Sequence, residues 1–247
     1  TQGVSSAASD VYKRQTAYSS GARLSTADVA QKRWDKDRAK PVTVTVGTNP
    51  VGVAFDGTSI WASNYGSSTV SKINPTTNTV TATVTVGNSP GGLVFDGTSM
   101  WVTNFSTDTI SKINPTTNTV TATVTVGDGP FEVAFDGTSL WVANDNAGTV
   151  SKINPTTNTV TATVTVGTSP LGVAFDGTSI WASNYGSSTV SKINPTTNTV
   201  TATVTVGTSP LGVAFDGTSI WASNYGSSTV SKINPTTNTV TATVTVG

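Results

Sequence analysis

The side chains of this chain that could do chemistry are carboxylates, because the sequence contains neither histidine nor cysteine. It therefore lacks the commonest acid–base group near neutral pH and any thiolate nucleophile or disulfide. Four carboxylates interrupt otherwise repeated stretches of sequence, namely Asp108, Asp128, Glu132 and Asp145. Carboxylates on neighbouring loops can bind a basic ligand or a cation, and calcium accepts oxygen ligands from separate loops. We predict that these four residues bind a ligand, with calcium as the one candidate cofactor and hydrated, exposed turns as the alternative.

The remaining short motifs do not indicate an active site. The stretch GNSPG at residues 87–91 matches G-x-S-x-G, but that motif needs a strand–turn–helix context and a histidine partner. No phosphate-binding loop, zinc-binding helix motif or EF-hand loop occurs in the sequence. The motifs therefore favour a protein that is not an enzyme.

Composition and charge limit the class of partner. Charged residues make up 11% of the 247 residues, well below the usual share of about a quarter. Residues 1–40 hold eight Lys or Arg and four Asp, whereas residues 41–247 hold five Lys and nine Asp or Glu. The mildly acidic main body argues against nucleic acid as a partner. No apolar run reaches the roughly 18 residues of a membrane helix, so we expect no membrane insertion.

The elements that must position these carboxylates are set by an internal repeat of 40 residues. Five units cover residues 51–90, 91–130, 131–170, 171–210 and 211–247, and the last two are identical over their shared length. A period near 40 with four strand-like segments is typical of a propeller blade. We predict an all-β fold, a β-propeller of four-stranded antiparallel blades, of which five are present. A parallel β-solenoid is the rival architecture.

The first unit shows why four strands are expected. Strands are predicted at residues 52–55, 59–64, 69–74 and 79–86. Asp56 and Gly57 mark a tight turn, because glycine adopts positive φ without strain. In the last strand valine or alanine alternates with threonine, which is typical of a strand with one dry and one wet face. The turn after the second strand and the connection before the first vary between units, and we expect both on the same face of the propeller.

Once these segments are in place, the unit resembles the YVTN-type β-propeller repeat. The tetrapeptide of that name has its counterparts in WASN (61–64), WVTN (101–104) and WVAN (141–144), with FDG before it and TVSKINPTTNTV behind it. The resemblance to the YVTN-type repeat covers residues 41–247. The unit resembles WD-repeat propellers less. The YVTN-type resemblance implies a bacterial or other prokaryotic protein that is extracellular, periplasmic or attached to the cell surface. It implies no single activity.

The repeated polar and aromatic residues of the unit have structural interpretations. Trp61 and its four equivalents are expected to be buried fillers between blades. Asn64 is expected to bind backbone groups where the strand meets the turn. Lys72 is expected to be solvated, with its stem lying along the sheet.

The ends of the chain depart from the repeat. We expect a disordered leader at residues 1–24, partly artefactual, and a short helix at 25–40 that Pro41 ends. Residues 41–47 repeat the sequence of a fourth strand, so an extra strand is predicted there. The sequence then contains more fourth strands than sets of the first three strands, so we expect it to be a fragment of a larger propeller. The five blades present form either a closed ring or an open arc.

Two functions of different classes remain. The first is a non-enzymatic binding or scaffold propeller that holds an unknown protein or carbohydrate ligand on its variable loop face. The alternative is a fragment of a propeller enzyme, hydrolytic or similar to virginiamycin B lyase, with its catalytic residues in missing blades. The lyase resemblance implies a histidine base and carboxylate-held magnesium, and the chain contains no histidine.

Overall fold

The computed structural model describes residues 43–246, and the described residues from Val44 on form one compact unit. Twenty strands follow one another in five sets of four: β1 (Pro50–Phe55), β2 (Ile60–Asn64), β3 (Thr69–Asn74), β4 (Thr79–Thr85), β5 (Pro90–Phe95), β6 (Met100–Asn104), β7 (Thr109–Asn114), β8 (Thr119–Thr125), β9 (Pro130–Phe135), β10 (Leu140–Asn144), β11 (Thr149–Asn154), β12 (Thr159–Thr165), β13 (Pro170–Phe175), β14 (Ile180–Asn184), β15 (Thr189–Asn194), β16 (Thr199–Thr205), β17 (Pro210–Phe215), β18 (Ile220–Asn224), β19 (Thr229–Asn234) and β20 (Thr239–Thr245). Two short 3-10 turns lie in blades 2 and 5, η1 (Phe105–Thr107) and η2 (Tyr225–Ser227).

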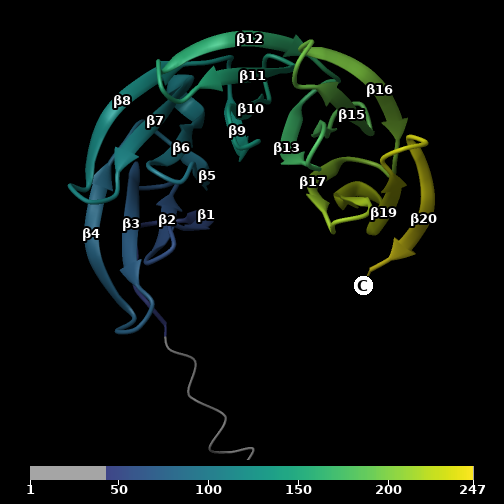
Figure 1. Ribbon diagram of the computed structural model, residues 1–247. Helices are drawn as coiled ribbons and strands as arrows, with labels where there is room; N and C mark the ends of the chain where they lie inside the picture. Colours follow the sequence, from purple (N-terminus) through teal and green to yellow (C-terminus); the bar gives the residue numbers. More distant parts are fainter. Residues whose placement is uncertain (1–42, 247) are drawn as a thin grey trace, which may run out of the picture. The chain divides into compact units, whose positions relative to one another are not determined.

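Each set of four strands forms one antiparallel sheet, a blade, in which neighbours in sequence are neighbours in space. The first strands of the blades contact one another in the order β1, β5, β9, β13 and β17. The fourth strands lie on the outside of an arc that stays open between the first and last blades (Figure 1). The predicted all-β fold of five four-stranded antiparallel blades is therefore confirmed, as an open arc.

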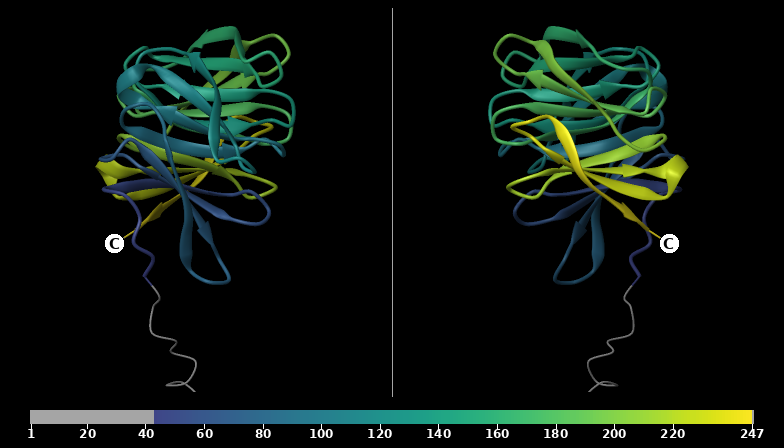
Figure 2. Two further views of the ribbon diagram at one scale, coloured as in Figure 1. Left: turned by 90° about the vertical axis from the view of Figure 1, so that its left-hand side faces the viewer. Right: turned by 90° about the vertical axis from the view of Figure 1, so that its right-hand side faces the viewer.

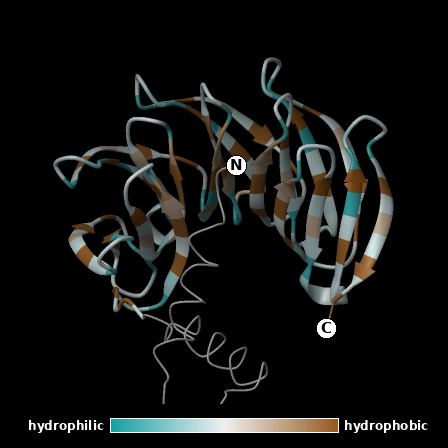
Figure 3. Ribbon diagram, turned by 60° about the horizontal axis from the view of Figure 1, so that its bottom comes forward, coloured by the Kyte–Doolittle hydropathy of each residue, from teal (hydrophilic) through white to brown (hydrophobic). Residues whose placement is uncertain are grey.

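Local sequence explains the strand ends. Asp56 and its equivalents end the first strand because their carboxylates accept hydrogen bonds from the backbone N–H groups two and three residues later, and Gly57 follows at φ +92°. Pro50 is the first residue of β1 and pairs with Asn64, with an irregular register before Val53. The strands carry apolar segments, whereas the turns are mostly hydrophilic (Figure 3).

The core lies between blades. One cluster joins Trp61, Val70 and Val84 of blade 1 to Leu93, Met100, Val102 and Ile113 of blade 2. Equivalent clusters join blades 2 and 3, 3 and 4, and 4 and 5. The sheets twist against one another in the side views (Figure 2). Trp61, Trp101, Trp141 and Trp181 are fully buried, whereas Trp221 in the last blade is partly exposed. The packing role expected for the tryptophans is thus confirmed wherever a next blade follows.

The N-terminal expectations have different outcomes. The expected leader at 1–24 and helix at 25–40 lie outside the described residues. Residues 43–46 belong to no strand, so the extra strand expected at 41–47 does not form in the described part of that segment. The physical reason is that each of the five blades already contains its own fourth strand. Among residues 43–246, no helix is long and apolar enough to cross a membrane.

Candidate functional site

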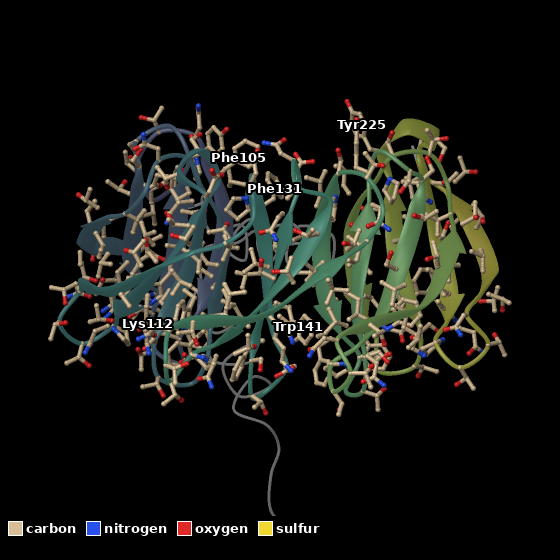
Figure 4. The ribbon with its side chains drawn as sticks, turned by 90° about the horizontal axis from the view of Figure 1, so that it is seen from above. Phe105, Lys112, Phe131, Trp141 and Tyr225 are labelled. Carbon is tan, nitrogen blue, oxygen red and sulfur yellow. The ribbon has the colours of Figure 1, made fainter. Side chains whose placement is uncertain are left out.

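The blades carry their turns on two opposite rims. The invariant rim holds the turn after the first strand and the turn after the third, whose sequences repeat unchanged. The variable rim holds the turn after the second strand and the connection between blades, which differ from unit to unit. Phe105, Phe131 and Tyr225 lie toward the variable rim, and Lys112 and Trp141 lie toward the opposite rim (Figure 4).

On the invariant rim, an aspartate holds each tryptophan. One carboxylate oxygen of Asp56 accepts hydrogen bonds from the backbone N–H groups of Thr58 and Ser59, and the other accepts one from the Trp61 indole at 2.7 Å. Burial by itself would raise the pKa of Asp56, but these hydrogen bonds outweigh it and lower the pKa to about 2. The same indole–carboxylate bond recurs in all five blades. These aspartates are structural.

A lysine on the same rim joins each blade to the next. The ammonium group of Lys72 lies 5.2 Å from the centre of the Trp61 ring and donates a hydrogen bond to the Pro115 carbonyl of blade 2 at 2.7 Å. Lys112, Lys152 and Lys192 repeat this contact with the following blade. These lysines were expected to be solvated or to snorkel; they are half-buried, and the next blade supplies a carbonyl for each charged group, a contact that the sequence did not predict. We call this Asp–Trp–Lys–carbonyl arrangement the inter-blade tie.

The repeated asparagine also differs from expectation. The Asn64 amide nitrogen donates to the hydroxyls of Thr69 and Ser71 on β3, not to the backbone groups that sequence reasoning proposed. The side chain is fully buried, and its carbonyl oxygen has no hydrogen-bond partner. Thr69 is the register partner of Asn64 across the β2–β3 pair, and Ser71 lies two residues further along β3 on the same face.

A shallow depression on the invariant rim lies between blades 4 and 5. Its lining residues are Asp176, Thr178, Lys192, Phe215, Pro235 and Thr236. Asp176, Lys192 and Pro235 are members of the inter-blade tie between those blades. Hydrogen bonds within the tie already use their polar groups, so the depression offers few free groups to a ligand.

On the variable rim, the structure gathers three of the four predicted site residues around one connection, residues 126–129. The Asp108 carboxylate accepts a hydrogen bond from the Gly129 backbone N–H at 3.0 Å. The backbone N–H of Asp145 donates to the Gly129 carbonyl at 2.8 Å, and the Asp128 carboxylate accepts from the Asn146 amide at 2.9 Å. Turns of blades 2 and 3 thus meet at this connection.

The fourth predicted residue, Glu132, lies on β9 and not in a turn. Within the described part of the chain, its carboxylate accepts one hydrogen bond, from the backbone N–H of Val133 at 3.3 Å. Burial raises the pKa of Glu132, and that one hydrogen bond opposes the shift only in part. The other four blades have glycine at this position, Gly52, Gly92, Gly172 and Gly212. Glu132 is therefore a partly buried carboxylate without a cationic partner among the described residues.

Sequence reasoning missed an aromatic pair beside these acids. The rings of Phe105 and Phe131 meet edge to face with their centres 6.4 Å apart. Phe105 stands where blades 1, 4 and 5 have tyrosine, and Phe131 stands where they have valine or leucine. Both positions depart from the repeated sequence, and this shared departure is the signal from which the pair could have been predicted.

The acids do not form a cluster suited to a metal ion. In the part of the chain that the structure describes, no three Asp, Glu, His or Cys residues lie close enough to hold one. Asp108 and Asp128 already accept hydrogen bonds from protein groups. Calcium would have to find most of its ligands elsewhere.

The fold and the repeated ties define this chain as a β-propeller-like repeat protein. Among solved structures it is similar to virginiamycin B lyase from Staphylococcus aureus, determined as a catalytically inactive variant with quinupristin, at TM-score 0.70 and 13% identity, covering 81% of this chain and 71% of that one. It is also similar to a functionally unknown protein from Desulfotomaculum acetoxidans, at TM-score 0.67 and 16% identity, over 77% of this chain and 67% of that one.

A third similar structure is hydrazine synthase from Kuenenia stuttgartiensis, at TM-score 0.64 and 20% identity over 80% of this chain. This chain spans 60% of the length of that protein. No family model and no curated protein matches the sequence. Identities at this level show the fold alone.

Proposed function

We propose that this chain is a non-enzymatic binding propeller that holds its ligand on the variable rim of blades 2 and 3. The observation that carries the proposal is where the departures from the repeat fall. Asp108, Asp128, Asp145 and the Phe105–Phe131 pair all lie at the meeting of these two blades on that rim. Loops on a rigid scaffold are the usual place for binding residues.

The chemistry of this rim favours a ligand with a positive charge and an apolar portion. Asp128 and Asp145 supply negative charge at the turns, and Glu132 adds a partly buried carboxylate whose pKa is raised by desolvation. A cation would stabilise the ionised form of Glu132, and an aromatic pair offers both apolar surface and a negative ring face. A lysine or arginine side chain of a protein partner has both properties. The YVTN-type resemblance supports display outside the cytoplasm.

The enzyme alternative has less support. The likeness to virginiamycin B lyase extends to the fold, and the chain has no histidine to serve as a base. The carboxylates with lowered pKa, Asp56, Asp176 and Asp216, each accept the structural hydrogen bond from the blade tryptophan. The perturbed groups on the invariant rim therefore have a structural explanation.

A test can use the repeat itself as the reference. Benzylamine, an aromatic cation, would be titrated against the protein while backbone amide shifts are followed, with benzyl alcohol as its neutral counterpart. The variant Asp108→Ser, Asp128→Thr, Glu132→Gly and Asp145→Tyr restores at each position the residue of blade 4. We expect benzylamine to shift the amides of residues 128–132 and 145–148 in the natural sequence, and this response to disappear in the variant.

A matched control restores repeat residues in the core instead. Met100→Ile, Ile110→Val and Leu140→Ile also move blades 2 and 3 toward blade 4, but these side chains are buried between blades. This control variant should respond to benzylamine as the natural sequence does. Equal responses to the amine and the alcohol, or an unchanged response after restoring the rim, would refute the proposed site.

A further inference from the structure

Six pairs of aspartate followed by glycine occur among the residues that the structure describes. Five of them stand at the turn after the first strand of each blade and begin at Asp56, Asp96, Asp136, Asp176 and Asp216. The sixth, Asp128–Gly129, lies in the connection between blades 2 and 3 on the variable rim. The other blades have threonine or asparagine followed by asparagine or serine at these two positions. In an aspartate–glycine pair the next backbone nitrogen can attack the side-chain carboxyl group, because glycine has no side chain to hinder the attack.

The five turn aspartates are held away from this reaction. One carboxylate oxygen of Asp136 accepts hydrogen bonds from the backbone N–H groups of Thr138 and Ser139. The other oxygen accepts a hydrogen bond from the Trp141 indole, so both oxygens are committed to residues further along the chain. The same three bonds recur at the other four turns. In Asp56 they favour the ionised carboxylate, which has no hydroxyl group to lose as water.

The sixth pair has a different setting, because blades 2 and 3 supply a polar group to each of its reacting parts. The backbone N–H of Gly129 donates a hydrogen bond to the Asp108 carboxylate at 3.0 Å. The Asn146 amide donates a hydrogen bond to the Asp128 carboxylate at 2.9 Å. The nitrogen of that amide would also lie 2.9 Å from a side-chain carbon on Gly129, so one amide lies against both members of the pair.

Backbone hydrogen bonds hold the connection in place around this pair. The N–H of Asp145 donates to the Gly129 carbonyl at 2.8 Å, and the N–H of Ala147 donates to the Asp128 carbonyl at 3.2 Å. Gly129 is buried, whereas Asp128 is exposed. The backbone nitrogen is therefore fixed beside the Asp108 carboxylate, while the Asp128 side chain stays open to water.

We propose that Asp128 and Gly129 form a cyclic succinimide in the folded protein and that hydrolysis of this ring converts Asp128 to isoaspartate. The Gly129 nitrogen forms a bond to the carboxyl carbon of protonated Asp128, while the Asp108 carboxylate takes the proton of that nitrogen as a general base. Asp108 then gives the proton to the departing hydroxyl group, which leaves as water. The Asn146 amide stabilises the negative charge that develops on the Asp128 oxygen.

Hydrolysis of the ring returns the water that its formation released. When the bond to the original backbone carbonyl is cleaved, the chain continues through the side chain of residue 128, which is then isoaspartate; cleavage of the other bond restores aspartate. The conversion needs no further reactant. It adds one carbon to the backbone of the connection between blades 2 and 3 and moves the carboxyl group of residue 128. The reaction does not depend on the ligand proposed for this rim.

Mass spectrometry of the aged protein tests the proposal. The folded chain would be incubated at mildly acidic pH and digested with trypsin, and electron-transfer fragmentation would distinguish isoaspartate from aspartate at each residue. Cleavage after Lys112 and Lys152 leaves Asp128 and Asp136 on one peptide, so a turn pair serves as the internal reference. We expect isoaspartate to accumulate at Asp128 and not at Asp136. In urea both should react at similar rates, and Asp128 should react more slowly than in the folded chain.

Two variants separate the role of the base from that of nearby charge. Asp108→Asn keeps a hydrogen-bond acceptor for Gly129 but removes the base, so it should slow the reaction at Asp128 about a hundredfold, the lower end of what a positioned base contributes. Glu132→Gln is the matched control, because the Glu132 carboxylate bonds to Val133 and to neither member of the pair, and it should react as the natural chain does. Circular dichroism would establish that both variants are folded.

Three results would overturn the proposal. The first is a folded chain in which Asp128 reacts no faster than Asp136, and the second is a folded chain in which Asp128 reacts no faster than in urea. The third is an unchanged rate at Asp128 in the folded Asp108→Asn variant, which would mean that Asp108 only holds the connection.

Discussion

Replacing one lysine of the inter-blade tie by methionine should destabilise the protein by an amount that depends on whether a next blade follows. Lys152 donates to the Pro195 carbonyl of blade 4 at 2.7 Å and lies 5.2 Å from the Trp141 ring centre. Lys232 lies at the same distance, 5.2 Å, from the Trp221 ring, and no blade follows it to accept a hydrogen bond among residues 43–246. Methionine keeps most of the apolar stem and removes the charge.

The magnitudes follow from the two contacts. A cation–π contact near the surface contributes about 0.5–1 kcal/mol, and a hydrogen bond from a charged donor contributes about 1.5–3 kcal/mol. Lys152→Met loses both contacts, so we expect a loss of about 2–4 kcal/mol in the free energy of unfolding. Lys232→Met loses the first alone, so the expected loss is about 0.5–1 kcal/mol.

Urea unfolding followed by circular dichroism measures both values. Lys192→Met should reproduce the result for Lys152→Met, because Lys192 donates to the Pro235 carbonyl in the same way. If Lys152→Met and Lys232→Met lower the free energy of unfolding equally, the hydrogen bond from lysine to the next blade contributes nothing to stability. The lysine would then act only through its contact with the tryptophan of its own blade.

Three further predictions concern other groups of the blade and can be checked by thermal or urea unfolding. Trp141→Ala should cost about 3–5 kcal/mol through the cavity it leaves, whereas Trp221→Ala should cost less because Trp221 lacks a covering blade; equal costs would contradict the packing argument. The lowered pKa of Asp56 means that its ionised form favours folding, so this stability is present above the ordinary value of 3.8 and is lost as the pH falls toward about 2. Asp56→Asn should therefore weaken the fall in melting temperature between pH 4 and pH 2, and an unchanged fall would count against the assignment. The raised pKa of Glu132 has the opposite sign, since its ionised form disfavours folding above the folded-state pKa. Glu132→Gln should raise the melting temperature at pH 7, with the gain shrinking below the ordinary value of 4.5, and a lower melting temperature at pH 7 would mean that Glu132 has a partner already.

Much of the fold could be predicted from the sequence because the determinants of each blade are local. The Asp56–Gly57 turn, the alternation in 79–86 and the fixed position of Trp61 all lie within one unit, and the period of 40 residues sets the number of blades. The second and third strands were predicted within one residue of their observed ends. The first strand was predicted from Gly52, whereas β1 begins two residues earlier at Pro50, a first position in a strand that tolerates proline.

The role of the lysines could not be predicted because their partners are backbone carbonyls of another blade. Lys72 stands among threonine and serine residues, a setting that predicts a solvated side chain. Its hydrogen-bond acceptor, the Pro115 carbonyl, lies 43 residues further along the chain. A carbonyl is present in every residue, so no residue type marks it as the acceptor. The aromatic pair of Phe105 and Phe131 was missed for a related reason, since their proximity arises from packing of blade 2 on blade 3.

The repeat also explains where a blade can depart from the repeated sequence and acquire binding residues. Such positions are the turns of the variable rim and the position of Glu132 on β9. A residue that faces the next blade must suit the residue one period later, and a side-chain carbon on Gly172 would lie 2.6 Å from the Leu211 carbonyl and 2.8 Å from the Ser183 hydroxyl. Glu132 occupies the equivalent position in blade 3, where Ala143 replaces that serine and removes the hydroxyl.

In blade 3 the loss of this hydroxyl relieves one of the two close contacts, that with the side chain of the second strand. On the invariant rim such a change is harder, because the ties use the side chains of aspartate, tryptophan and lysine together. The connections of the variable rim are held mainly by backbone groups, as in the bond from the Tyr65 N–H to the Asn49 carbonyl and from the Asp145 N–H to the Gly129 carbonyl. Backbone bonds tolerate many side chains, so this rim can change its chemistry while the blades keep their packing.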